Sequence, residues 1–187
     1  MPEVGSIGAT ALYALNQWLI TATSDAIAAA EKAATALATQ AGVDAVVAEL
    51  KALFTKGGKD ALDLSQIVNE STFNNGPALV ATAKELFGEA CIIDAKQERM
   101  SSFCTTNIYY EGPSNIENYG KVGADVYKAT YTSQKGTLEA AKVGSVNTTY
   151  AGYHTSIIAS IAAVVVIVLI MVIIYLILYK YIYIKYI

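Results

Sequence analysis

The C-terminal end of the chain is one long apolar run, SIIASIAAVVVIVLIMVIIYLILYKYIYIKYI, from Ser156 to Ile187. Between Ile157 and Tyr179 it has no charged residue, no proline and no glycine. As an α-helix this stretch would rise roughly 34 Å, and the hydrocarbon core of a bilayer is about 30 Å thick. Its β-branched residues would favour a strand in water, but in lipid a single segment satisfies its backbone hydrogen bonds only as a helix. We therefore predict a transmembrane helix over 156–179, marked by Ile157, Ala163, Leu169, Tyr175 and Tyr179.

The residues on either side of this run support the same prediction. Tyr150 and Tyr153 precede it, and tyrosine prefers the interface between membrane and water. Lys180 and Lys185 follow it in the tail 180–187, and every acidic residue of the chain lies before it. Positive charge favours the cytoplasmic side, so we expect the C-terminus in the cytoplasm and the N-terminal part outside, although only two lysines contribute.

The beginning of the chain, MPEVGSIGATALYALNQW, does not have the pattern of a signal peptide. It lacks a basic first region and a dense apolar core. Two arrangements remain open from these residues. The protein is either a tail-anchored structural or adaptor protein with its domain in the cytosol, or a surface protein whose leader lies upstream.

The alanine-rich first half of the chain predicts helices. Ser24 can cap a helix that Gly42 ends, and Asp44 can cap a second helix that ends at Gly57. Alanine buries little area per residue, so we expect a thin core with marginal stability. The apolar positions expected to face that core are Ile27, Ala30, Ala34 and Leu37 in the first helix, and Val46, Val47, Leu50, Leu53 and Phe54 in the second.

The second half is less regular. Pro77 can open a third helix that Gly88 ends, with Leu79, Val80, Ala83, Leu86 and Phe87 as its stripe. A shorter helix is expected over 63–70. The polar stretch that follows the third helix, with two cysteines and a Gly-Pro turn, predicts an irregular loop. After it a helical pattern resumes, weakened or broken at Gly136 and Gly144.

Together these patterns predict a mainly α fold. It would be an alanine-rich helical ectodomain with an irregular cysteine-containing loop and one C-terminal transmembrane helix. The parts are a helical region, 1–88; a variable loop region, 89–120; a helical stalk, 121–155; the transmembrane helix, 156–179; and the tail, 180–187.

The residues that carry chemistry are few. Cys91 and Cys104 are the only cysteines, and they either form a disulfide in an oxidising compartment or stay reduced in the cytosol. His154 is the only histidine and stands just before the apolar run, where an interfacial role is expected. We find no pattern for a catalytic cluster, a metal site or a cofactor. The net charge of −3 and the lack of a basic patch argue against nucleic acid as a partner.

Tyrosines provide the candidate contact residues. Tyr109 and Tyr110 lie in the irregular loop, and Tyr119 lies near its end. Tyrosine is enriched at the energetic centres of protein interfaces, so contact with a partner is one role for these three. Packing the loop onto the domain is the other.

Both ends of the chain resemble rifins, the variant surface antigens of malaria parasites of the falciparum group. The start, MPEVGSIGATALYALNQW followed by AIAAAEKAA, resembles the middle of that family over about residues 1–34. The close, VNTTYAGYHTSIIASIAAVVVIVLIMVIIYLIL, resembles its end over about residues 140–178. The stretch between is what the family varies.

The resemblance implies a protein displayed on the infected red cell, with the variable helical region outside and a short tail inside. It implies antigenic variation, immune evasion and adhesion without catalysis. The implied partners besides the lipid bilayer are inhibitory immunoglobulin-like receptors of leukocytes or glycans of the red-cell surface. The family's cysteine-rich first domain and its basic tail have no counterpart in these residues, which leaves a truncated member that is not displayed as an alternative.

Overall fold

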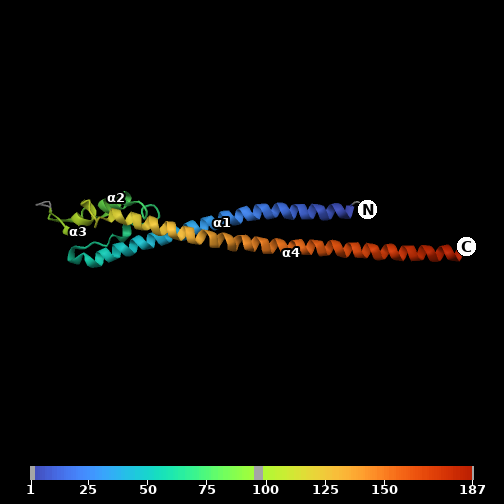
Figure 1. The fold of residues 1–187 in the computed structure, drawn as a ribbon. Coiled ribbons are helices and arrows are strands. Elements are labelled where there is room, and N and C mark those ends of the chain that lie inside the picture. The colour runs from blue at the N-terminus through green and yellow to red at the C-terminus, as the bar shows by residue number, and fades with distance from the viewer. Residues whose placement is uncertain (1–2, 95–98, 187) are drawn as a thin grey trace. The chain divides into compact units, whose positions relative to one another are not determined.

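The fold is mainly helical, as predicted, with one short hairpin (Figure 1). The computed structural model describes residues 3–94 and 99–186, and the side chains of 8–94 and 99–182. Lys185 of the predicted tail therefore lies outside the described side chains. In chain order the elements are α1 (Glu3–Lys56), η1 (Gly58–Asp60), η2 (Leu64–Ile67), α2 (Gly76–Phe87), β1 (Ile92–Asp94), β2 (Arg99–Met100), α3 (Ser102–Cys104), the π-helical turn η3 (Thr105–Tyr109), η4 (Ile116–Asn118) and α4 (Tyr119–Tyr186).

Two compact units divide the chain. The terminal unit consists of Met1–Ala29 and Glu139–Ile187, and the central unit is Ala30–Leu138. Each long helix therefore contributes to both units. The predicted boundaries of the five parts stay predictions.

The hydrophobic core lies in the central unit. On α1 it begins with Ala30, Ala34 and Ala38, which recur every four residues on one helix face and are fully buried. Further core residues come from the end of α1, from η2, α2, α3, η3 and η4, and from the turns at Phe73 and Cys91. They are Val46, Leu50, Leu64, Ile67, Phe73, Leu79, Ala83, Cys91, Phe103, Cys104, Ile108 and Ile116.

The prediction of two separate helices in the first half is wrong, because α1 runs through Gly42 without a break. A Cβ at Gly42 would lie 2.5 Å from the Phe73 ring and 3.0 Å from the carbonyl oxygen of Gly123. The glycine therefore serves close packing rather than helix termination. Ser24 and Asp44 lie inside the helix, where Asp44 accepts a hydrogen bond from the Gln40 side chain instead of capping.

The predicted stripes are only partly correct. Val46, Leu50, Leu79 and Ala83 are buried as expected. Four other residues assigned to these stripes are exposed: Ile27, Leu37, Phe54 and Leu86. In α1 the buried line follows the alanines, because small side chains let neighbouring segments approach the helix closely.

The third helix was predicted within one residue. The Asn75 side chain accepts a hydrogen bond from the Ala78 amide, Pro77 lies in the first turn, and Gly88 caps the C-terminus. The short helix expected over 63–70 is the single 3₁₀ turn η2, capped by Asp63. The hydrogen bond from Ser65 is the main cause that lowers the pKa of Asp63.

Of the two effects expected at Gly136 and Gly144, a weakened helix or a break, the break is wrong. Helix α4 continues through Gly136 and Gly144, and a Cβ at either position would meet nothing within 4 Å. Among the described residues this is the one helix long and apolar enough to cross a membrane, with a mean hydropathy of 3.5 in its most apolar stretch. None of that stretch is buried.

Candidate functional site

A disulfide closes the irregular region of the central unit. Cys91 is bonded to Cys104, thirteen residues further along the chain, and both are fully buried. The Cys91 amide donates to the Phe87 carbonyl over 2.9 Å, and the Ser101 amide donates to the Cys91 carbonyl over 2.8 Å. The bridge therefore joins the start of the β1–β2 hairpin to α3, and the hydrogen bond to Phe87 ties it to the C-terminal end of α2. The sequence left open whether these cysteines pair.

The hairpin carries apolar side chains on its surface. Ile92 is 47% exposed and Ile93 is 58% exposed. Consecutive strand residues point to opposite faces, so neither face of β1 is covered at these positions. Met100, the cross-strand partner of Ile92, is 37% exposed. The short hairpin therefore has exposed apolar side chains on both faces, which makes it a candidate for contact with a partner.

Tyr109 and Tyr110 project from the turn that follows α3. The Tyr109 ring lies under the Lys84 ammonium of α2, with 5.2 Å between the nitrogen and the ring centroid. Tyr110 is 65% exposed, and its ring lies close over the backbone of Gly112. The rings of both tyrosines therefore lie at the surface, and their backbone packs on the buried residues beneath the turn.

Buried polar and apolar residues hold the backbone of the turn that carries these tyrosines. The Asn107 side chain donates to the Phe103 carbonyl over 2.8 Å, and the Asn115 side chain donates to the Tyr110 carbonyl over 2.8 Å. Phe103 packs so closely on Gly57 that a Cβ there would lie 2.7 Å from its ring. A buried polar group that keeps its hydrogen bonds fixes one backbone conformation. The exposed surface therefore stands on a rigid support.

Tyr119 lies differently from the other two tyrosines. It begins α4, is only half-exposed and packs against the core cluster. Burial raises the pKa of its hydroxyl, and the Glu49 carboxylate adds to that effect. These surroundings favour the packing role for Tyr119. The contact role of all three tyrosines stays a prediction.

We define the candidate contact surface by five residues: Ile92, Ile93, Met100, Tyr109 and Tyr110. All five are exposed. The hairpin is tied to the C-terminal end of α2 by the hydrogen bond from Cys91 to Phe87, and Tyr109 is tied to α2 by its contact with Lys84. Sequence reasoning included the three hairpin residues in the irregular region 89–120 but did not single them out. The signal available was the apolar pair directly after Cys91, in a stretch otherwise polar enough to suggest a plain loop.

The structure also shows where the cysteines and the histidine lie. Both cysteines are consumed in the disulfide, so neither supplies a thiolate. His154 stacks on Tyr150 in α4, with ring centroids 5.6 Å apart. Within 3–94 and 99–186, no three residues of the types His, Cys, Asp and Glu lie close enough together to hold a metal ion.

The family model described as Rifin matches residues 1–182. This chain belongs to the rifin family. The match includes the middle of the chain, which the resemblance at the two ends did not cover. Comparison with curated proteins and with solved structures gave no match. Rifins are variant surface antigens, so the chain that carries this hairpin and these tyrosines is a member of a surface-antigen family.

Proposed function

We propose that this rifin acts as a displayed antigen that contacts a host receptor through the candidate contact surface and is anchored by α4 in the membrane of the infected red cell. The central unit would lie outside the cell and the tail inside. The single observation that carries the contact role is the exposure of Ile92, Ile93 and Met100 on a disulfide-fixed hairpin. Exposed apolar side chains close together on a folded unit are suited to contact with a partner.

The chemistry of this surface favours a protein receptor. Isoleucine, methionine and tyrosine offer apolar area, and aromatic residues and methionine are enriched at protein interfaces. A leukocyte receptor of the inhibitory immunoglobulin-like class fits this character. Red-cell glycans are the second candidate, because the exposed Tyr110 ring offers a flat face for stacking.

A cytosolic, tail-anchored protein is the alternative, and the disulfide argues against it. Disulfides form and persist in oxidising compartments and are rare in the cytosol. The two arrangements differ in which side of the membrane carries the central unit. Trypsin added outside intact cells would cleave between Lys84 and Lys128 if the protein is displayed, and would leave this region whole if it is not.

The contact role is tested by single substitutions in the displayed protein. Tyr110→Ala and Ile93→Ala remove exposed side chains and should each weaken binding to receptor-bearing cells by about tenfold, the equivalent of about 1.4 kcal/mol. Tyr13→Ala and Ile27→Ala remove exposed side chains of the same types from α1 and should leave binding unchanged. If all four variants bind like the parent, the candidate contact surface is not the receptor site.

A further inference from the structure

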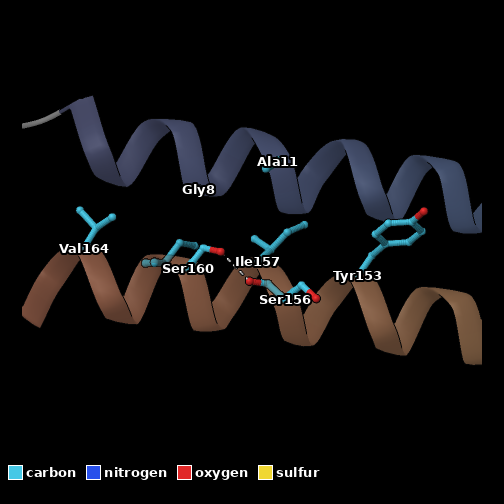
Figure 2. Close-up of a pocket in the computed structure, with 8 residues that line it drawn as sticks. Gly8, Ala11, Tyr153, Ser156, Ile157, Ser160 and Val164 are labelled. Carbon is cyan, nitrogen blue, oxygen red and sulfur yellow. Dashed lines mark hydrogen bonds between the residues drawn. The ribbon is translucent and has the colours of Figure 1, made fainter.

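The terminal unit contains an apolar groove between its two helical segments. Gly8 and Ala11 of α1 line one side, and α4 lines the other from Tyr153 to Val164 (Figure 2). The helices approach closely at Gly8, where a Cβ would lie 2.8 Å from the Ile161 side chain. The groove has a volume of about 510 Å³, within the range of ~300–1,000 Å³ typical of ligand sites.

The walls of the groove favour an apolar occupant. Ser156 and Ser160 are polar residues in the lining, but their hydroxyls already donate to carbonyls of their own helix. Ser156 donates to Gly152 over 3.0 Å, and Ser160 donates to Ser156 over 2.9 Å, the bond drawn in Figure 2. The other residues that line the groove have no polar side chain except Tyr153, which lies at one end of the groove in Figure 2. A ligand that depends on hydrogen bonds would gain little here.

The position of the groove along α4 points to lipid. From Tyr153 to Val164 the helix rises about 16 Å, and this stretch crosses from the polar approach into the charge-free run. Beside the lining residues, α4 also exposes the apolar side chains of Ile158 and Val165. Whatever surrounds those side chains also reaches the groove, and in a bilayer that is acyl chains.

The sequence of α1 is consistent with contact with lipid. Residues 4–24 contain no charged side chain, and the exposed Tyr13 and Trp18 lie within this stretch. Tyrosine and tryptophan are the side chains that favour the membrane interface. The first turns of α1 therefore have the composition of a segment that lies at the depth of headgroups and upper acyl chains.

We propose that one acyl chain of a phospholipid, from the leaflet that α4 enters at Tyr153, occupies the groove between Gly8–Ala11 and Tyr153–Val164. The first turns of α1 are then a second element of the membrane anchor. This inference rests on the proposed anchoring by α4, but it makes a separate statement about α1. A second copy of the chain packed into this groove would be the competing occupant, and it would keep lipid out.

Depth in the bilayer is measured with single-tryptophan variants of the full chain in phosphatidylcholine vesicles that contain dibrominated lipid. Trp18 is the only tryptophan, so Trp18→Phe gives a dark background. Into it, tryptophan is placed as Ala9→Trp beside the groove, Ala28→Trp farther along α1, or Val165→Trp in α4. We expect strong quenching at positions 9 and 165 and little at 28.

The three reporters separate the two proposals. Quenching at position 165 without quenching at position 9 would overturn the lipid groove and leave the anchoring by α4 intact. Loss of quenching at position 165 would overturn the anchoring, and the groove proposal with it. Quenching at all three positions would mean that α1 lies along the membrane rather than entering it beside α4, and would also overturn the inference.

Occupancy of the groove is tested with a phosphatidylcholine that carries a photoactivatable diazirine on an acyl chain. Illumination should attach lipid to the segment that precedes Lys32, and Ala11→Phe should lower this yield several-fold because the ring fills the groove. Ala9→Phe adds the same side chain at an exposed position outside the lining and should keep the parent yield. Equal yields in all three proteins, or equal losses in both variants, would contradict a specific lipid seat.

Discussion

At the residue scale, glycines in the long helices have opposite roles that the sequence does not distinguish. Gly42 has no room for a Cβ, which would meet the Phe73 ring at 2.5 Å, whereas Gly136 has nothing within 4 Å. We expect Gly42→Ala to lower the free energy of unfolding by about 1–3 kcal/mol through overpacking. Gly136→Ala should raise it by about 0.5–1 kcal/mol through helix propensity.

Urea unfolding of the full chain in detergent, followed by circular dichroism, measures both effects. The two variants carry the same chemical change, so their opposite signs test the packing explanation directly. A stabilised Gly42→Ala variant would mean that Phe73 and the backbone of Gly123 move aside at little cost, and that close packing does not explain this glycine.

A second prediction at this scale concerns Glu31 and Lys135, which join α1 to α4 within the central unit by an ion pair. The hydrogen bond from Lys135 lowers the pKa of Glu31 below its ordinary 4.5, and the same bond raises the pKa of Lys135 above its ordinary 10.5. The contribution of Glu31 is complete above pH 4.5 and is lost as the pH falls through its lowered pKa. The contribution of Lys135 is complete below pH 10.5 and is lost as the pH rises through its raised pKa.

The pair should therefore stabilise the central unit fully between these two values. Both side chains are exposed, so the effect is small and weakens in high salt. Glu31→Gln should lower the melting temperature at pH 7 in low salt, and this difference should vanish once Glu31 is protonated in the folded parent. The exposed Glu85→Gln serves as the control. A difference between parent and Glu31→Gln that persists in strong acid would assign the effect to something other than charge.

At the scale of elements, the disulfide should stabilise the hairpin far more than the long helices. Replacing both Cys91 and Cys104 by alanine removes a bridge across thirteen residues and should cost roughly 3 kcal/mol of unfolding free energy. Because the bridge supports β1, β2 and the tyrosine turn, binding through the candidate contact surface should fall as well. The helical circular dichroism of α1 and α4 should remain.

Hydrogen exchange distinguishes a local from a general effect of this change. We expect exchange over residues 91–110 to accelerate much more than exchange in α1 from Ala30 to Lys56. Uniformly faster exchange across the central unit would mean that the disulfide supports the whole core. Unchanged exchange over 91–110 would contradict its role as the support of the hairpin.

The sequence predicted helices well where local signals and packing agree. Helix α2 has a cap, a proline in its first turn and a closing glycine, and its bounds were predicted within one residue. In α1 the same kind of signal failed, because Ser24, Gly42 and Asp44 resemble caps but lie inside a helix stabilised by contacts from Phe73 and Gly123. Those contacts come from residues distant in sequence, which no local pattern contains.

The candidate site was predicted only in outline for a related reason. Tyr109 and Tyr110 could be named from their residue type, and the irregular region around the cysteines was recognised from its composition. The hairpin was missed because its strands are very short, β1 with three residues and β2 with two, and are set by the disulfide and by the bonds around Ser101. The separate, half-buried surroundings of Tyr119 likewise depend on tertiary packing.

At the scale of the whole molecule, water and lipid would stabilise different units. All the buried hydrophobic residues of the core lie between Ala30 and Ile116, inside the central unit. In the terminal unit, among residues whose burial is described, Gly8 alone is buried. A unit that buries apolar side chains within itself can fold in water, whereas one that exposes them depends on lipid.

We therefore expect a fragment of residues 30–138 to fold in water without detergent, keeping its disulfide and its binding through the candidate contact surface. Its unfolding in urea should be cooperative, and Ile93→Ala should weaken binding of the fragment as it weakens binding of the full chain. The full chain without detergent should aggregate, because α4 exposes its apolar run to water. A fragment that is soluble but lacks cooperative unfolding would show that the core requires the terminal unit. The thin alanine face at Ala30, Ala34 and Ala38 would then be too small to hold α1 in place without the rest of that helix.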